Sequence, residues 1–389
     1  MYSFCFHVPT RIWFGKDTVS HLSEMRQSGT KALLVYGGGS IKRSGLYDRV
    51  LAVLSDAGIS VTELAGVEPN PRIETVRKGV QLCRDGRIDM VLAVGGGSTI
   101  DCAKVVAAGA KYDGDAWDLV LDGSKIQAAL PIYTVLTLSA TGSEMDKFAV
   151  ISDMTKNEKW GTAADCLKPT MSVLDPTLTY TVSKKQTAAG TADMMSHTME
   201  NYFTRETGAD VQQGFAEVIL RTAIKYGPIA LAQPDNYDAR ANLMWAASHA
   251  INGLVSEGSA NAWCIHPMEH ELSAFYDITH GQGLAILTPA WMEYVLSDNT
   301  KGMFAKFGRN VFGIDPLHQE DDLAVAKKGI AALRTFFFET MEMPANLRAV
   351  GITEKSKFDI MAEKAAKGSV GSYVPLTKND IKAIYEKAF

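Results

Sequence analysis

The chain has 389 residues, of which 46% are apolar and 21% charged, so it can build a large hydrophobic core. A chain longer than about 300 residues normally divides into two domains. The formal net charge of −5 offers no basic surface for nucleic acid or an anionic membrane, and no apolar run is long enough to span a bilayer, so neither partner is expected.

Cysteine usage and the N-terminus indicate the compartment. The five cysteines are scattered, odd in number and without a CxxC pair, which argues against a disulfide framework or a thiolate zinc site. The first residues lack the basic start and apolar run of a signal peptide. We therefore expect a cytoplasmic protein.

Two aromatic-rich runs open the chain. Phe4–His7 and Arg11–Phe14 have the composition of β-strands, with Pro9 between them and Gly15 after the second, so the pattern predicts a hairpin or an edge pair. An edge of this kind can pair with its copy in a second subunit, and we expect a homodimer.

From Lys31 onward, buried strands alternate with helices. The expected elements are strand Ala32–Tyr36, helix Gly45–Ala57, strand Ser60–Leu64, helix Ile73–Arg84, strand Met90–Val94, helix Thr99–Ala110, and strands Ala129–Leu138, Trp160–Ala163 and Met171–Leu174. This order predicts an α/β domain with a doubly wound parallel sheet, whose ligands lie beyond the carboxyl ends of the strands.

Two glycine-rich loops follow strands of this sheet. Gly37–Ser40 (GGGS) comes after the first buried strand, and Gly95–Asp101 (GGGSTID) follows a later one and opens a helix. Glycines allow close approach of a ligand, and the unpaired N–H groups of a helix start suit a pyrophosphate. Neither loop matches the GxGxxG or Walker pattern, and a tight turn with Ser98 as N-cap is the alternative.

A third loop is rich in hydroxyl groups. Thr137–Glu144 (TLSATGSE) follows the strand that begins at Ala129, so its hydroxyls can line the adenosine side of a dinucleotide. An ordinary loop with serine and threonine turns is the alternative. Asp101, in the first turn of the helix after GGGS, can order that loop or accept hydrogen bonds from a ribose.

Beyond Ser183 the pattern becomes helical. The expected helices are Lys184–Tyr202, Asp210–Tyr226, Ala239–Leu254, Pro267–Phe275, Leu284–Val295, Leu323–Met341 and shorter ones to Phe389. The chain is therefore expected to divide into residues 1–182, an α/β dinucleotide-binding domain, and residues 183–389, an all-α domain that binds metal and substrate.

Two segments of the helical half carry metal-ligand chemistry. Asp193 and His197 are four residues apart in a predicted helix, so both side chains leave one face. His266, His270 and His280 gather three of the eight histidines into a short stretch. One carboxylate and three imidazoles suit Fe²⁺ or Zn²⁺. Spacing alone does not choose between His266 and His270 as a ligand.

Taken together, these motifs resemble those of the iron-containing (group III) alcohol dehydrogenases. The two GGGS loops, TLSATGSE, the Asp193/His197 pair and the run Trp263–Gly283 carry the resemblance, which extends over essentially the whole chain. The branch that looks most similar is that of NADPH-dependent butanol dehydrogenases and broad-specificity aldehyde reductases. The family fold, an N-terminal dinucleotide-binding α/β domain and a C-terminal helical domain, agrees with the pattern above.

The resemblance implies a role for individual residues. By similarity the metal ligands are Asp193, His197, His266 and His280, while His270 lines the active site without ligating. Gly96, Gly97 and Ser98 hold the pyrophosphate and Asp101 supports their loop. The remaining positions expected to contact the cofactor are Asn70, Thr137, Leu138, Thr141 and Lys159. On sequence grounds alone, Lys159 is a surface lysine.

The first glycine loop bears on the choice of nicotinamide. Members of the family that prefer NAD tend to carry an aspartate after the first strand, where a carboxylate repels a 2′-phosphate. Here Gly37, Gly38, Gly39 and Ser40 fill that place, with Lys42 and Arg43 beyond. We therefore expect NADP(H) in preference to NAD(H).

The expected reaction transfers a hydride between NADP(H) and a primary alcohol or aldehyde, with the metal as Lewis acid on the substrate oxygen. Fe²⁺ is expected from the family, although Zn²⁺ also suits the ligands. His270 is the candidate proton relay. The alternatives are a zinc enzyme like glycerol dehydrogenase or dehydroquinate synthase, a non-redox metal hydrolase and an inactive binding protein.

Overall fold

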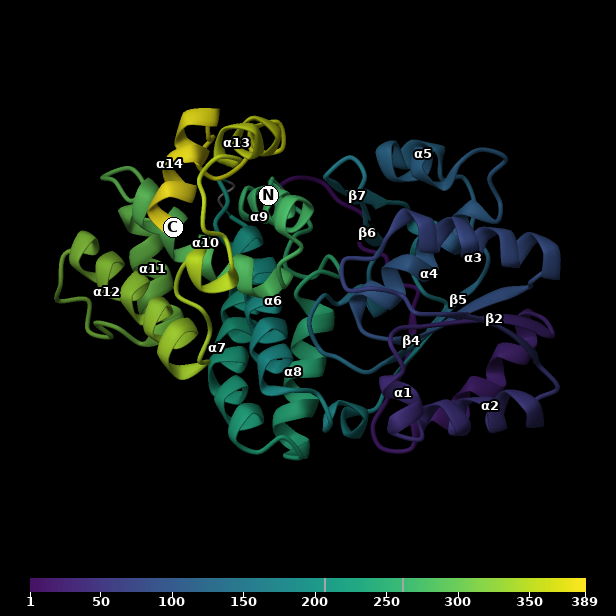
Figure 1. Ribbon diagram of the computed structural model, residues 1–389. Coiled ribbons are helices and arrows are strands. Elements are labelled where there is room, and N and C mark those ends of the chain that lie inside the picture. Colours follow the sequence, from purple (N-terminus) through teal and green to yellow (C-terminus); the bar gives the residue numbers. More distant parts are fainter. Residues whose placement is uncertain (206–207, 261) are drawn as a thin grey trace. The chain divides into compact units, whose positions relative to one another are not determined.

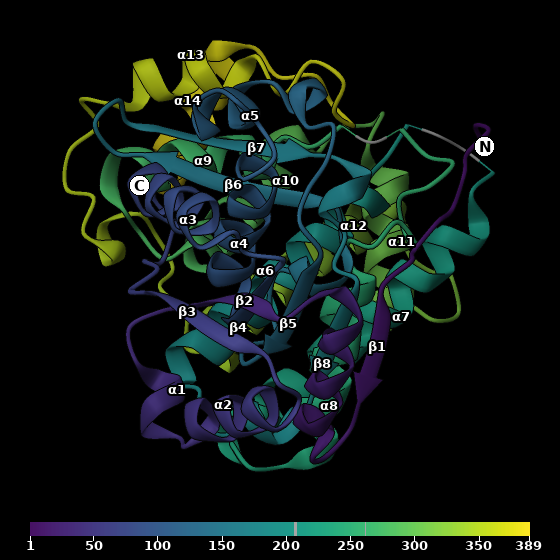
Figure 2. The ribbon, with the colours of Figure 1, turned by 90° about the vertical axis from the view of Figure 1, so that its right-hand side faces the viewer.

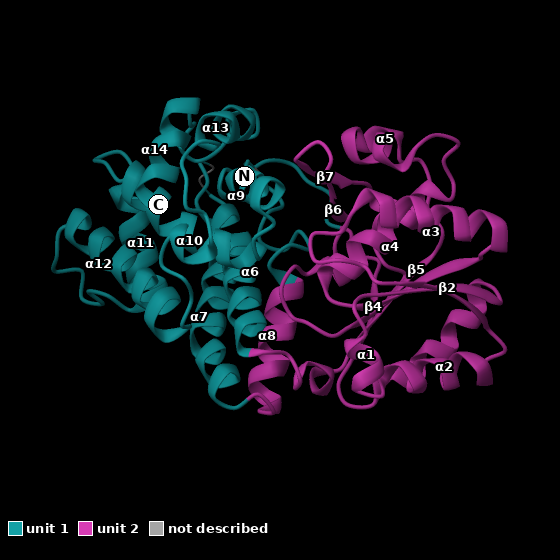
Figure 3. Cartoon of the chain, in the orientation of Figure 1, with its two compact units in different colours: residues 1–6, 184–233, 249–389 teal, residues 7–183, 234–248 magenta. Residues whose placement is uncertain are grey.

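The computed structural model describes residues 1–205, 208–260 and 262–389, which pack into two compact units (Figures 1 and 3). Unit 1 consists of Met1–Phe6, Lys184–Gln233 and His249–Phe389, and unit 2 of His7–Ser183 and Pro234–Ser248. Most of each unit therefore lies on one side of residue 183. The first six residues and residues 234–248 each belong to the unit on the other side.

Unit 2 is built on the predicted parallel sheet. Six strands lie in the order β1-β8-β5-β4-β2-β3, and every neighbouring pair is parallel. Their bounds are Arg11–Phe14 (β1), Lys31–Tyr36 (β2), Ser60–Ala65 (β3), Met90–Gly95 (β4), Ile132–Leu136 (β5) and Met171–Leu174 (β8). The predicted fold class, a parallel α/β unit followed by a helical unit, is confirmed.

Both faces of this sheet are covered by helices, which explains why its inner strands β2, β4, β5 and β8 are almost entirely buried, whereas the edge strands β1 and β3 are not. Leu33 and Val35 of β2 join a core with α3 (Ile73–Gly86) and α4 (Gly97–Gly109). The alternate residue Leu34 joins a second core with η1 (Thr18–Ser28) and α2 (Leu46–Asp56). Figures 1 and 2 show α3 and α4 on one face of the sheet and α2 on the other.

The other elements of unit 2 are short, apart from α8. They are α1 (Ser40–Arg43), α5 (Ala116–Leu121), η2 (Gly123–Lys125), η3 (Ser143–Met145), η4 (Asp165–Leu167), η5 (Pro176–Thr179) and the antiparallel pair β6 (Phe148–Asp153) and β7 (Glu158–Ala163). Helix α8 (Tyr237–His249) ends earlier than the predicted Ala239–Leu254, and nearly all of it packs with unit 2.

The predicted N-terminal hairpin is wrong. Arg11–Phe14 forms β1, but it pairs in parallel with β8, beside which it lies in Figure 2. The described residues 4–7 lie outside any strand. The reason is that residues 1–6 leave the sheet and pack on unit 1, where the Tyr2 backbone N–H donates to the carbonyl of Gly258 over 2.9 Å.

Unit 1 is helical. Its helices are α6 (Lys184–Tyr202), α7 (Asp210–Ala232), α9 (Ile265–Tyr276), α10 (His280–Val295), α11 (Lys301–Phe312), α12 (Asp322–Thr335), α13 (Phe358–Ala366) and α14 (Lys378–Ala388), with a π-helical turn η6 (Phe336–Thr340) and a 3₁₀ turn η7 (Arg348–Val350). Helix α7 runs through Gly227 and Pro228, where the sequence predicted its end. Among the described residues, no helix combines the length and the apolar character that crossing a bilayer requires.

Helix α6 is the centre of unit 1. Every residue from Thr187 to Tyr202 is buried, so the helix is enclosed on all sides, and it contacts both α7 and α10. A helix that is buried all round is normally apolar. Helix α6 instead carries Asp193, His197 and Glu200 into the interior, and each of these groups needs a specific partner.

Candidate functional site

The buried face of α6 meets two other helices at Asp193. His266 lies in the first turn of α9, and His280 is the first residue of α10. Oδ1 of Asp193 lies 3.6 Å from Nε2 of His197, 3.9 Å from Nε2 of His266 and 3.7 Å from Nε2 of His280. All four predicted ligands therefore lie around Oδ1 of Asp193, and the ligand atoms of Asp193, His266 and His280 all lie within 4.8 Å of one another.

These separations suit a shared ion better than hydrogen bonds. All three exceed the 3.5 Å limit of a useful hydrogen bond. Around a tetrahedral ion with bonds of about 2.1 Å, ligand atoms lie roughly 3.4 Å apart. Oδ1 of Asp193 and Nε2 of His266 are buried and have no hydrogen-bond partner in the described part of the chain. Unpaired buried atoms of this kind are costly, and a cation among them would remove the cost.

Burial and the neighbouring charges set the protonation of these groups. Burial raises the pKa of Asp193, but the surrounding histidines lower it further, so its net pKa lies below the ordinary value. Burial lowers the pKa of His197 to about 3. Burial opposes charge on His266 too, but Asp193 and Glu200 raise its pKa to about 9. Metal ligands must be deprotonated, so the lowered pKa values of Asp193 and His197 favour the forms that can bind an ion.

Two glycines allow α10 to place His280 beside Asp193. A Cβ at Gly281 would lie 2.0 Å from the backbone oxygen of Ala189 in α6, and a Cβ at Gly283 would lie 2.7 Å from Cγ of Glu269 in α9. Only glycine permits such an approach. Close helix packing therefore explains the two glycines of the sequence His280-Gly-Gln-Gly283, for which the sequence alone predicted no role.

Two buried glutamates next to the histidines were also missed. Oε1 of Glu200 lies 2.7 Å from Nδ1 of His266, and Oε2 of Glu269 is hydrogen-bonded to Nδ1 of His280. Glu200 is 8% exposed and Glu269 is fully buried. Each glutamate follows a predicted ligand by three residues, Glu200 after His197 and Glu269 after His266, but this spacing does not indicate the histidine that each glutamate contacts.

His270 lies beside the four grouped side chains. It follows His266 by one turn of α9, and its ring centroid is 5.6 Å from that of His280 and 6.1 Å from that of His266. Its ring nitrogens group with Glu269 and His280 rather than with Asp193. The structure thus offers what spacing could not, a reason to separate His266 from His270.

In unit 2, the second glycine loop lies at the carboxyl end of β4. Gly96, rather than Ser98, is the N-cap of α4, and a Cβ at Gly97 would lie 2.3 Å from the side chain of Thr141. The backbone N–H of Thr137 donates to the carbonyl of Gly95 over 3.0 Å. The glycine loop and the TLSATGSE loop are therefore adjacent, and Leu138 also contacts Gly96. A helix start with glycine on its first turn is suited to a phosphate.

Asp101 joins these loops. Its Oδ1 accepts from the Ser143 hydroxyl over 2.6 Å, and its Oδ2 accepts from the backbone N–H of Val150 over 3.0 Å. Burial raises the pKa of Asp101 to about 6. Because both oxygens are engaged within the protein, the geometry favours the loop-ordering role over the ribose contact.

Asn70 and Lys159 also meet in unit 2. Nζ of Lys159 donates to Oδ1 of Asn70 over 3.0 Å. Lys159 is 5% exposed, so the surface position suggested by the sequence alone is wrong. It is enclosed because β7 pairs with β6, where Lys159 is opposite Ser152. Asn70 has a φ of +53°, a conformation that asparagine tolerates.

The first glycine loop is the most open of the predicted segments. Gly39 has a φ of +94° and is the N-cap of α1, while Gly38 has nothing within 4 Å of a Cβ position. Ser40 is exposed and begins α1. Beyond it, Nζ of Lys42 lies over the rings of Tyr36 and Tyr47 at 5.1 and 4.5 Å.

Both halves of the chain match the sequences of known proteins. Residues 9–176 match the family model described as iron-containing alcohol dehydrogenase, and residues 187–389 match the model for the C-terminal part of the Fe-containing alcohol dehydrogenase family. An NADH-dependent butanol dehydrogenase A of Clostridium acetobutylicum is 55% identical, with 100% of both chains covered. The NADPH-dependent aldehyde reductase YqhD of Escherichia coli is 39% identical over the full length of both chains.

A solved structure agrees over the whole chain. The crystal structure of an NADH-dependent butanol dehydrogenase A from Thermotoga maritima matches with a TM-score of 0.94 at 38% identity, covering 100% of this chain and 99% of that one. The names of the relatives divide between the two nicotinamides.

Proposed function

The chain belongs to the iron-containing alcohol dehydrogenase family, and we propose that it transfers a hydride between NADP(H) and a primary alcohol or aldehyde in a metal-dependent reaction. It is an NAD(P)-dependent oxidoreductase acting on CH–OH groups, as its family and relatives are. The lyase, hydrolase and binding-protein alternatives are therefore set aside.

The grouping of Asp193 with three imidazole nitrogens is the observation that carries the proposal. Asp193, His197, His266 and His280 would hold one divalent ion, with Fe²⁺ expected and Zn²⁺ also suited to the donors. The ion, when bound, supplies a Lewis acid for the substrate oxygen. The carboxylate supplies the only negative charge among the four donors, and the enclosed helix α6 keeps two of them one turn apart.

The nucleotide is proposed to bind at the carboxyl edge of the unit 2 sheet. Gly96, Gly97 and Ser98 would hold the pyrophosphate with Asp101 ordering their loop, and the nicotinamide ring supplies or accepts the hydride. The adenosine side would be lined by Thr137, Leu138 and Thr141, and further contacts would come from Asn70 and Lys159. The adjacency of the glycine loop to Thr137, Leu138 and Thr141 supports a shared site for the pyrophosphate and the adenosine.

The first glycine loop supports NADP(H) in preference to NAD(H). Gly37–Ser40 contains no carboxylate that would repel a 2′-phosphate, and Lys42 and Arg43 follow it. Glu63 lies 3.9 Å from Lys42, but its carboxylate accepts from the hydroxyls of Tyr36 and Tyr47. We therefore assign the 2′-phosphate of the cofactor to Gly37–Ser40 and to the cationic side chains of Lys42 and Arg43.

Gly38→Asp tests this assignment. The ratio of kcat/KM for NADPH to that for NADH is expected to fall at least about tenfold, a change of about 1.4 kcal/mol, because the new carboxylate repels the 2′-phosphate. Steric strain is not expected, since a Cβ at this position meets nothing within 4 Å. Gly38→Asn is the matched control for size. A ratio that is equal in both variants and in wild type would remove the first loop from cofactor selection.

A proton must also move during the reaction, and His270 is proposed to carry it. Imidazole exchanges protons near neutral pH, and the ring lies beside His280 and His266 without joining the group around Asp193. This position suits a group that passes a proton between the substrate and solvent.

We also propose a homodimer, formed through an apolar surface of unit 1. The exposed apolar side chains of this surface are Met1, Tyr2, Phe4, Phe6, Val211, Phe215 and Val218. The N-terminal residues of this surface lie beside those of α7, because Nε2 of Gln212 in α7 contacts the sulfur of Met1. A large exposed apolar patch normally binds another protein. A monomeric mass in light scattering would contradict this proposal.

The reaction itself is tested with metal-free protein. Anaerobic addition of Fe²⁺ or Zn²⁺ is expected to produce aldehyde-dependent oxidation of NADPH with short and medium-chain aldehydes, measured from the nicotinamide absorbance. The metal-free sample and a sample with added Mg²⁺, which prefers oxygen ligands, are the controls. Equal turnover with and without the transition metal would contradict a metal-dependent reaction.

A further inference from the structure

We infer that Glu200 and Glu269 are positioning residues, each fixing the tautomer and the ring orientation of one histidine so that the Nε2 atoms of His266 and His280 face the ion. The inference rests on the proposed metal site and adds residues that do not contact the ion. It concerns only contacts within unit 1.

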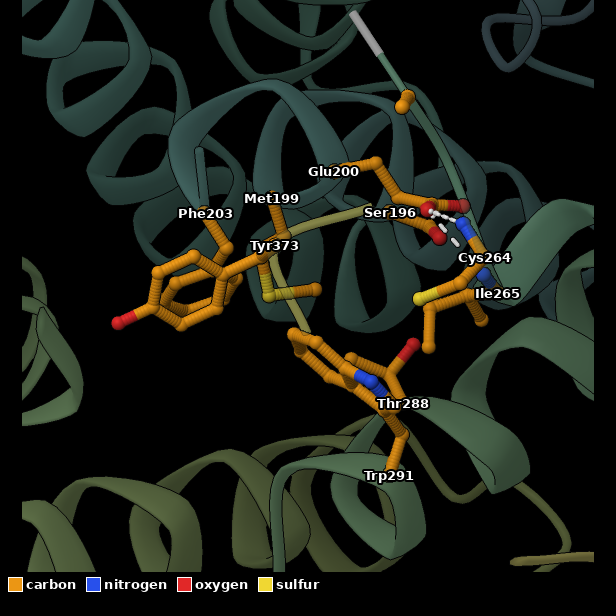
Figure 4. Close-up of a pocket in the computed structure, with 10 residues that line it drawn as sticks. Ser196, Met199, Glu200, Phe203, Cys264, Ile265, Thr288, Trp291 and Tyr373 are labelled. Carbon is orange, nitrogen blue, oxygen red and sulfur yellow. Dashed lines mark hydrogen bonds between the residues drawn. The ribbon is translucent and has the colours of Figure 1, made fainter. Parts of the chain in front are cut away.

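Glu200 is surrounded by donors. Its carboxylate accepts from the backbone N–H groups of Cys264 (2.6 Å), Ile265 (3.1 Å) and His266 (2.7 Å), and Figure 4 shows it directed at the first two. Because these three partners are all N–H donors, both oxygens of Glu200 act as acceptors. The contact of 2.7 Å to Nδ1 of His266 must then be an N–H donated by the ring. The lone pair of the neutral ring is consequently on Nε2, on the side of Asp193.

Glu269 makes the equivalent contact with His280. It is fully buried, its Oε1 accepts from the Ser273 hydroxyl over 2.5 Å, and its Oε2 is bonded to Nδ1 of His280. Gly283 leaves room for this arrangement, because a Cβ there would lie 2.9 Å from Oε1 of Glu269. A carboxylate behind a histidine ligand makes the ring a more basic donor and holds its plane.

His197 is held differently. Its Nδ1 is buried and has no hydrogen-bond partner among the described residues. Its ring instead stacks on that of His266, with centroids 4.7 Å apart and planes 13° apart. Packing therefore orients His197, whereas hydrogen bonds orient the other two imidazoles. The site is expected to depend on Glu200 and Glu269 for two of its three nitrogen donors.

A simpler role is available for each carboxylate. Glu200 stabilises the first turn of α9, and Glu269 holds Ser273. These roles predict a loss of stability in the metal-free protein, with no specific loss of metal affinity. Glutamine separates the two explanations at Glu269, because its oxygen can still accept from Ser273 while its NH₂ group, when it faces Nδ1 of His280, favours the tautomer with a proton on Nε2. At Glu200 the NH₂ group also meets a backbone N–H donor, so the stability of the metal-free variant must be measured beside its affinity.

The experiment measures the dissociation constant for Zn²⁺, by competition with a chelator, in Glu200→Gln and Glu269→Gln. Each variant is expected to bind about 10- to 100-fold more weakly than wild type. The matched control is Glu271→Gln. Glu271 lies in α9, as Glu269 does, is 4% exposed and pairs with Lys364 over 3.1 Å. The dissociation constant of this control is expected to match that of wild type. Thermal unfolding of each metal-free variant gives the structural effect separately.

Weaker binding in both glutamine variants, with wild-type affinity in the control, supports the inference. Unchanged affinity in Glu269→Gln overturns it for His280, and this variant also decides the matter if Glu200→Gln fails to fold, since Glu269 is not at a helix start. A loss of affinity in all three variants overturns it in favour of a general effect of buried carboxylates. A wild-type protein that binds no ion overturns the proposed function, and this inference with it.

Discussion

Replacing His280 or His266 with alanine is expected to remove the stoichiometric metal ion and to abolish aldehyde reduction. Four ligands that share a binding free energy of about 10–16 kcal/mol contribute roughly 3 kcal/mol each, so losing one weakens binding by about two orders of magnitude. Dialysis against a chelator is then expected to strip the ion from the variants while wild type keeps it, which leaves the substrate oxygen without a Lewis acid. Metal content by elemental analysis and turnover with NADPH measure the two effects.

Nucleotide binding should survive in the same variants. The loops proposed to hold the pyrophosphate belong to unit 2, whereas both histidines belong to unit 1. The dissociation constant for NADPH, measured by fluorescence, is therefore expected to stay within about twofold of wild type. A parallel loss of nucleotide and metal would indicate a general folding defect instead of a missing ligand.

His270→Ala is the matched variant for His266→Ala, since it removes an imidazole one turn later in the same helix, α9. It is expected to keep the metal ion and to slow turnover, which is the proposed consequence of losing a proton carrier. If His270→Ala loses the ion while His266→Ala keeps it, the assignment of the two histidines is reversed. An unchanged rate would remove His270 from the reaction.

The sequence predicted what local patterns determine. Helix α6 has the predicted bounds because it contains no proline from Lys184 to Tyr202, and its one glycine, Gly190, is tolerated inside a helix. The parallel sheet was likewise predictable from apolar strands that alternate with helices. The hairpin of Phe4–His7 with Arg11–Phe14 failed because strand pairing is non-local, and β8, far along the chain, is the partner of β1.

The residues of the candidate site were likewise predictable only where local spacing determines them. The pair Asp193 and His197 follows from helical spacing, which is a local rule. The choice between His266 and His270 depends on which turn of α9 approaches α6, and no spacing within one helix reveals this. Glu200 was invisible as a partner of His266 because the two residues are distant in the sequence and meet through a carboxylate at the start of another helix.

Gly281→Ala is expected to destabilise the metal-free protein by about 3 kcal/mol or more, at the upper end of the usual cost of overpacking. The added Cβ would lie 2.0 Å from the backbone oxygen and 2.6 Å from the carbonyl carbon of Ala189. These atoms belong to the interior of α6, so no side chain can rotate away and a helix must shift. The midpoint of thermal unfolding should fall by about 6–12 °C for a unit of this size.

The same substitution should weaken metal binding, because Gly281 follows His280 directly. Any shift of α10 away from α6 increases the separation between Nε2 of His280 and Oδ1 of Asp193, which is 3.7 Å in the folded protein. Gly281→Ala therefore couples stability to metal affinity, although the added methyl group bears no charge and no ligand atom. Calorimetric titration of the folded fraction with Zn²⁺ measures this second effect.

Gly302→Ala provides the control for a glycine in a helix of the same unit. Gly302 lies in the first turn of α11, and a Cβ there would meet only Oδ2 of Asp322, at an ordinary 3.9 Å, so alanine should stabilise the helix by up to about 1 kcal/mol through its higher propensity. The two substitutions are chemically identical, and their opposite signs follow only from what each methyl group meets. Equal unfolding midpoints in both variants would mean that α10 does not pack on α6 as closely as the structure places it, and the proximity of His280 to Asp193 would lose its support.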